Sequence, residues 1–100
     1  MSDYLEFGAK LLRRAMLVCL SEMPKNSLTT SELFIWISNE LDWATRDMVE
    51  THAQWLKEQG YVTSETAGAM GLRLHLTDRG GDVAARRVRV PGVAKSATEA

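Results

Sequence analysis

Apolar side chains recur along this chain first with a helical period and later with the alternation of a strand. Over residues 3–22 they fill one broad arc of a helical wheel, about 200° wide, where a surface helix needs a stripe of about 100°. Leu17 lies outside that arc, among polar positions. This helix is therefore either central to the fold or carries a second face that packs against another chain. Pro24 and Asn26 end it.

Two further helices follow in close succession. Thr29 and Glu32 fit a capping box that opens a helix ending near Leu41. A short turn comes next, and Thr45 is a suitable N-cap for a third helix. Gly60 supplies its C-terminal stop. The pattern predicts a helix-turn-helix pair.

Two strand candidates follow these helices. Residues 61–65 are rich in β-formers, and apolar and polar side chains alternate over residues 72–76. Residues 66–71 between them are the expected tip of a hairpin. Thr77 then begins a final short helix, and residues 88–93 continue as an extended strip of basic and apolar side chains.

The order helix, helix, tight turn, helix, hairpin, helix predicts a mainly α fold with a small β-hairpin, the winged helix-turn-helix arrangement. Trp55–Val62 and Leu76–Gly80 resemble the WLxxxGYV and LTxxG segments of bacterial winged-helix regulators. We expect a winged-helix domain over residues 1–93 and a flexible tail over residues 94–100.

Several further segments are shared with one narrower family. They are Met1–Glu6, Thr45–Asp47, Thr51, Trp55–Leu56, Glu58–Gly60, Leu76–Thr77, Arg79–Gly80, Asp82–Ala85 and Arg89–Val93. The segment Arg89–Val93 is the most distinctive of them. Through these segments the chain resembles the small winged-helix proteins encoded in Mu-like bacteriophages and prophages. The resemblance implies the winged-helix fold and a phage origin, and hence the cytoplasm of a bacterial host.

Composition and charge narrow the classes of function. Hydrophobic residues make up 45% of the 100 residues and charged residues 25%, as in an ordinary soluble domain, and the net charge of -1 excludes a histone-like binder. Residues 28–60 carry six acids against two bases, whereas residues 61–100 carry six bases against four acids. No apolar stretch near the N-terminus approaches the length of a membrane span, so no membrane contact is expected.

Nothing in the sequence predicts catalysis or a cofactor. The single cysteine, Cys19, cannot form an internal disulfide, and Cys19, His52 and His75 lack the spacing of metal ligands. No serine or cysteine lies in a nucleophile motif, and no glycine-rich phosphate loop follows a strand. Gly68–Gly71 matches the GXXG of KH domains, but it joins two strands instead of two helices, so we expect a plain turn. We expect a protein that is not an enzyme and acts by binding alone.

The first hypothesis is that the partner is double-stranded DNA. A winged helix presents the outer face of its third helix to the major groove. That face here also carries Asp47, Glu50 and Glu58, which repel phosphate, so an ordinary solvated face is the alternative interpretation. The phosphate contacts would then shift to the arginines of the hairpin and of the C-terminal part. The alternative interpretation of these arginines is that they complement a helix dipole and belong to a solvated tail. The candidate nucleic-acid-binding residues are Arg46, Thr51, Gln54, Lys57, Arg73, Arg86, Arg87 and Arg89.

The second hypothesis is a winged helix that binds another phage or host protein and makes no DNA contact. Its candidate interface residues are Ile35 and Trp43, which are hard to bury in the expected fold, and Leu17, which lies among the polar positions of the first helix. The broad apolar arc of the first helix, with Leu17 and the strip 88–93 nearby, also predicts a homodimer.

Overall fold

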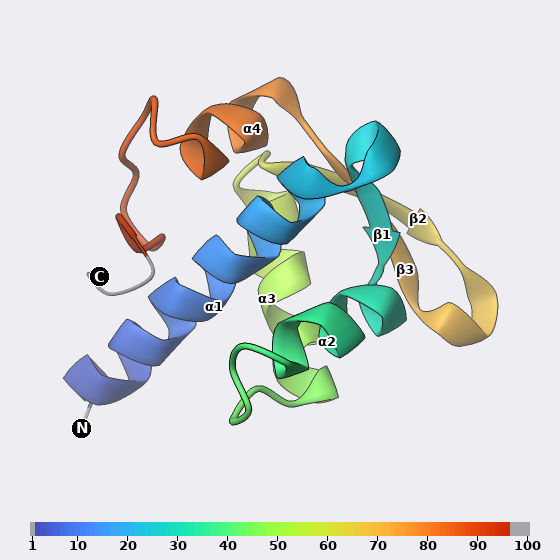
Figure 1. Ribbon diagram of the computed structural model, residues 1–100, viewed down its shortest axis with the longest axis horizontal. Coiled ribbons are helices and arrows are strands. Elements are labelled where there is room, and N and C mark those ends of the chain that lie inside the picture. The colour runs from blue at the N-terminus through green and yellow to red at the C-terminus, as the bar shows by residue number, and fades with distance from the viewer. Residues whose placement is uncertain (1, 97–100) are drawn as a thin grey trace.

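The computed structural model describes the backbone of residues 2–96 and the side chains of residues 5–96. Figure 1 shows one long helix lying across the other helices, with a small sheet beside them. The elements in chain order are α1 (Ser2–Glu22), a 3-10 turn (Pro24–Asn26), β1 (Ser27–Thr29), α2 (Thr30–Ser38), α3 (Arg46–Glu58), β2 (Val62–Thr66), a second 3-10 turn (Gly68–Met70), β3 (Leu72–Leu76) and α4 (Asp78–Ala84). The chain is thus mainly helical with a small antiparallel sheet, as predicted, and this arrangement is compatible with a winged helix.

The sheet has three strands where the sequence predicted a two-stranded hairpin. Its order is β1-β3-β2, and Leu28 of β1 lies opposite Leu74 of β3. A strand of three residues is too short for alternation to show, and the pattern around Thr29 indicates a helix cap instead. One consequence is that α2 leaves directly from the edge of the sheet, which fixes the direction of that helix.

The predicted caps are confirmed by hydrogen bonds. The Thr29 hydroxyl accepts from the backbone N–H of Glu32 at 3.1 Å, and the Glu32 carboxylate accepts from the N–H of Thr29 at 2.8 Å. These bonds are the main reason that the pKa of Glu32 is lowered. At the starts of α3 and α4, the hydroxyls of Thr45 and Thr77 accept from the backbone N–H groups of Met48 and Gly80, without a reciprocal carboxylate. α2 ends at Ser38, earlier than predicted, in a tight closing turn.

α1 is the centre of the fold, which explains its broad apolar arc. It packs against α2, α3 and α4 and also contacts the sheet. Leu12, Leu17 and Leu20 are each 0% exposed. The prediction that Leu17 lies in an interface with another chain is therefore wrong. The flank that looks polar on a helical wheel is covered within the chain itself, because α1 has a packing partner on that side as well.

α3 presents its predicted inner face to the core. Val49 and Leu56 are 0% exposed and Ala53 is 1% exposed. Tyr61, just after the helix, is also buried and its ring lies 6.2 Å from that of Trp55. The helix is thereby locked in one register, which determines the residues on its outer face. None of the helices over residues 2–96 combines the length and the hydropathy that crossing a bilayer requires.

The chain after α4 returns along α1 (Figure 1). Ala94 is 2% exposed, and its N–H donates to the carbonyl of Lys10 at 3.2 Å. The predicted flexible tail therefore begins too early, because Ala94 is packed on α1. Residues 97–100 of that predicted tail lie outside the described residues.

Candidate nucleic-acid interface

The outer face of α3 carries most of the predicted groove contacts. Thr51, Gln54 and Lys57 are exposed there. The guanidinium of Arg46 hydrogen-bonds the Ser31 hydroxyl of α2. Its Nε also lies 3.9 Å from the Glu50 carboxylate, so an acid already offsets its charge.

The acids of this face are largely unpaired. Asp47 is exposed, and Glu58 accepts only a 3.5 Å hydrogen bond from the amide of Gln54. The face therefore remains acidic, as the sequence predicted. It offers polar groups to a partner but little positive charge.

The β2–β3 hairpin is fixed beside α2 at its tip. The Thr30 hydroxyl, fully buried, donates to the carbonyl of Met70 at 3.3 Å and accepts from the N–H of Leu72 at 3.2 Å. Gly71 lies so close that a Cβ on it would come within 2.1 Å of the Thr30 hydroxyl oxygen. Only glycine fits this approach. The GXXG segment is a turn between two strands, as predicted.

Arg73 of β3 already interacts with other residues of the chain. Its guanidinium donates to the Ser27 hydroxyl of β1 at 3.4 Å and lies near the Glu32 carboxylate, where its charge makes a minor contribution to the lowered pKa of Glu32. This basic residue therefore lies toward β1 and the start of α2.

An unpredicted cluster fixes the C-terminal segment to α3. Arg13 of α1 donates through Nε to Nδ1 of His52 at 3.2 Å and through a terminal nitrogen to the carbonyl of Gly92 at 3.0 Å. The Arg13 guanidinium carbon lies 3.9 Å from the centre of the Trp55 ring. His52 is thus a satisfied boundary residue, and its pKa is lowered by burial and then by the charge of Arg13. The residues of this cluster are far apart in the sequence, so no local pattern predicts it.

The three C-terminal arginines fall into different surroundings. Arg87 pairs with Asp82 at 2.8 Å on the surface. Arg86 and Arg89 instead line a hollow of about 490 Å³ between α1, α4 and the C-terminal segment. Five cations surround this hollow, which we call the basic hollow: Lys10, Arg14, Arg86, Arg89 and Lys95.

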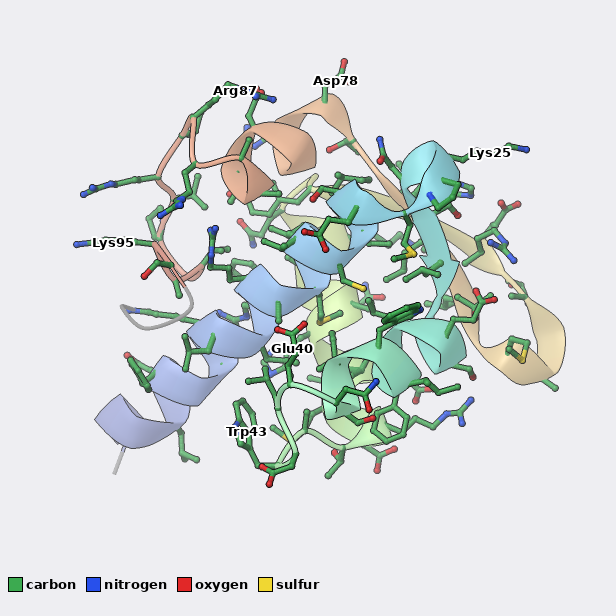
Figure 2. The ribbon with its side chains drawn as sticks, in the orientation of Figure 1. Lys25, Glu40, Trp43, Asp78, Arg87 and Lys95 are labelled. Carbon is green, nitrogen blue, oxygen red and sulfur yellow. The ribbon has the colours of Figure 1, made fainter. Side chains whose placement is uncertain are left out.

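Among the residues that the structure describes, no acid lines the basic hollow. None of its five cations forms an ion pair with any residue of that part of the chain. Figure 2 shows Lys95 extending outward from the C-terminal segment beside α1. The lining comes from α1, α4 and the C-terminal segment, and α3 takes no part in it. The structure therefore separates the predicted binding residues into a polar, acidic helix face and a basic site beside it.

Arg14 and Arg86 are close enough to repel each other. Burial lowers the pKa of Arg14, and the charge of Arg86 lowers it further. Arg14 also donates to the carbonyl of Ala94 at 3.5 Å, which holds it beside the C-terminal segment. Arg86 has a left-handed backbone, with φ of 63°, just beyond the end of α4 at Ala84. The turn at Arg86 is what separates its side chain from that of Arg87.

Apolar side chains are exposed on the opposite side of α1 and on α2. Ile35 is 61% exposed and Trp43 is 42% exposed, so the prediction that both are hard to bury is confirmed. Trp36, also on α2, is 52% exposed. Trp43 lies against Gly8 of α1, as its place below that helix in Figure 2 shows. Its neighbour on that helix, Phe7, is also exposed.

The remaining reactive groups form no recognisable site. Burial, followed by the charges of Glu22 and Glu40, raises the pKa of the Cys19 thiol to about 11, so it is protonated at neutral pH and a poor nucleophile. Over the described residues, no three His, Cys, Asp or Glu side chains gather as metal ligands would.

Comparisons with protein-family models, with curated proteins and with solved structures find no match to this chain. The resemblance to the winged-helix proteins of Mu-like phages therefore stays a prediction from the sequence.

Proposed function

We propose that this chain is a winged helix-turn-helix protein that binds double-stranded DNA and acts without catalysis. The order α1-β1-α2-α3-β2-β3 and the sheet order β1-β3-β2 support the winged-helix assignment. In this assignment α2 and α3 are the helix-turn-helix pair, and the β2–β3 hairpin is the wing.

The observation that carries the DNA proposal is the basic hollow. Its five cations have no acidic partner among the described residues, although the whole chain has a net charge of -1. Cations gathered in this manner repel one another and attract a polyanion. The backbone of duplex DNA supplies closely spaced phosphates, and neutralising them releases counterions and favours binding.

The outer face of α3 and the basic hollow would make different kinds of contact with DNA. Thr51 and Gln54 on α3 offer short polar side chains that suit base edges in the major groove. The basic hollow offers phosphate contacts, which hold a protein on the duplex without reading its sequence. The C-terminal segment adjoins α3 where Gly92 meets Trp55, so the two surfaces are neighbours. The acids of α3 lower the affinity and must be outweighed by the hollow.

A second candidate function is a protein-interaction module of phage development with no direct DNA contact. The exposed apolar side chains of Ile35, Trp36 and Trp43 favour it, because such side chains anchor protein interfaces. With Leu17 buried, the homodimer proposal rests on exposed Leu5 and Phe7 near the start of α1. Under this second function, Ile35→Ser or Trp43→Ser abolishes binding of the protein partner. The unmodified protein then does not bind DNA, so neither substitution changes DNA binding.

Titration of a random-sequence duplex at low and at physiological salt distinguishes the two functions. DNA binding that weakens steeply with salt supports the first. Glu50→Gln should tighten it, because this change removes an acid from α3 and releases Arg46 from its partner. If the unmodified protein binds neither random nor phage-derived duplexes at low salt, the DNA proposal is wrong and the interaction module takes its place.

A further inference from the structure

The basic hollow has the chemistry of a site for one particular kind of anion. Arg14 and Arg86 both line the hollow, and their positive charges repel each other. No acid of the described residues lines the hollow to offset these two charges. Lys10, Arg89 and Lys95 add three more charges around them. Part of the wall is aliphatic, from Val88 and other residues of the C-terminal segment, and aliphatic walls hydrate poorly. A bound anion would replace this repulsion with attraction to both guanidinium groups.

A phosphate group matches these demands better than a carboxylate. It carries up to two negative charges near neutral pH and three strongly accepting oxygens, so it can accept from two guanidinium groups at once. The planar donor forks of arginine suit phosphate geometry, whereas lysines at the rim act as point charges. The volume of about 490 Å³ lies within the range of small-molecule sites and leaves room for the group that carries the phosphate.

We propose that the basic hollow is a phosphate-binding site in which Arg14 and Arg86 hold the phosphate group. Lys10, Arg89 and Lys95 supply the surrounding positive charge. The site goes beyond the proposed function, because the phosphate belongs either to a DNA backbone or to a small phosphorylated molecule. In both cases the two guanidinium groups would donate to phosphate oxygens. A terminal phosphate offers up to two negative charges and three free oxygens, whereas a phosphate of the DNA backbone offers one charge and two free oxygens.

The chain offers a matched control in the next residue. Arg86 and Arg87 are adjacent and carry the same charge, but only Arg86 lines the hollow, whereas Arg87 pairs with Asp82. Changing either to glutamine alters the net charge equally. A difference between the two variants therefore reports on the hollow and not on overall charge. Both arginines are exposed, so both variants should keep the fold.

The test is a titration of the full chain with inorganic phosphate in chloride buffer at constant ionic strength, followed by backbone amide chemical shifts. We expect saturable shifts at residues 86–95 and near Lys10. Arg86→Gln should weaken phosphate binding about tenfold or more, as removal of a charge-assisted hydrogen bond does, and Arg87→Gln should change it less than about twofold. Equal weakening by both variants, or no saturable shift in the unmodified chain, overturns the proposal.

A second arm of the experiment identifies the source of the phosphate, using a short DNA duplex as the probe. If Arg86→Gln weakens the binding of both inorganic phosphate and the duplex, and phosphate displaces the duplex, the site holds a phosphate of the DNA backbone. If Arg86→Gln weakens the binding of inorganic phosphate alone, or if the unmodified chain binds phosphate but no duplex, the site serves a small phosphorylated ligand. The phosphate-site proposal stands in that case. If the duplex binds and phosphate does not, the phosphate site is overturned while DNA binding stands.

Discussion

Gly92 lies against the indole ring of Trp55, so closely that a Cβ on it would come within 2.6 Å of ring carbon Cζ2. The backbone of Gly92 has φ of 91°, and its carbonyl accepts a hydrogen bond from Arg13. This contact joins the C-terminal segment to α3 and to α1. It therefore holds the basic hollow in a fixed position beside the outer face of α3.

Gly92→Ala should destabilise the protein for two separable reasons. The left-handed backbone costs a residue with a Cβ about 1–2 kcal/mol, and the clash with Trp55 costs about 1–3 kcal/mol more. Gly60 is the matched control, because its φ is 82° and no described atom lies within 4 Å of a Cβ built there. Urea denaturation should show a larger drop in unfolding free energy for Gly92→Ala than for Gly60→Ala. Equal drops would mean that the close approach to Trp55 is absent in solution.

Leu56 is expected to anchor α3 in the core. It is 0% exposed, and Leu56→Ala should lower the free energy of unfolding by about 2–5 kcal/mol, a large part of the total for a domain of this size. Lys57→Ala, at the exposed neighbouring position, should stay within about 0.5 kcal/mol of the unmodified protein. Thermal or urea denaturation measures both. A melting curve barely changed by Leu56→Ala would show that the register of α3 is wrong.

Thr30→Val should loosen the hairpin tip. The substitution keeps the shape of the side chain but removes the hydroxyl that bonds Met70 and Leu72, leaving two backbone groups without that partner. We expect the free energy of unfolding to fall by about 1–3 kcal/mol and hydrogen exchange at the amide of Leu72 to become faster. Thr51→Val, on the exposed face of α3, is the control and should change neither quantity. Unchanged exchange at Leu72 in Thr30→Val would contradict the docked hairpin.

Stability should fall as the pH drops below the ordinary histidine value of 6.5, in part because of His52. The folded state lowers the pKa of His52, so below 6.5 the unfolded chain binds a proton that the folded chain binds less readily. Above 6.5 both states hold neutral imidazole and this destabilisation disappears. Urea denaturation at about pH 7.5 and about pH 5.5 should show a smaller decrease for His52→Gln than for the unmodified chain. The same decrease in both proteins would contradict the role given to His52.

The parts of the fold that depend on neighbouring residues could be predicted from the sequence. The Thr29 and Thr45 caps and the hairpin each depend on a few adjacent side chains, and the structure contains all of them. The third strand could not be predicted, because Ser27–Thr29 is ordered by pairing with β3 and not by its own pattern. The environment predicted for Leu17 is wrong because a helical wheel shows one helix and not the neighbours that cover it.

The sequence could predict which types of residue the candidate site contains, but not which of these residues lie together. The acidic character of α3 follows from the sequence alone. The different surroundings of Arg86 and Arg87 depend on a left-handed backbone at Arg86. The basic hollow also needs Lys10 and Arg14, which lie more than half the chain away from the other cations. Charge counted along the sequence cannot reveal such long-range proximity.

The central claim is that duplex DNA is held through the basic hollow, and its most direct test is the salt dependence of DNA affinity. For the unmodified protein, the logarithm of the binding constant should fall linearly with the logarithm of the salt concentration. In the double variant Arg86→Gln/Arg89→Gln the slope should be shallower by about 0.9 for each phosphate that the protein no longer neutralises, whereas Arg87→Gln should keep the original slope. Equal slopes in all three proteins, or no binding of the unmodified protein at low salt, would contradict the account.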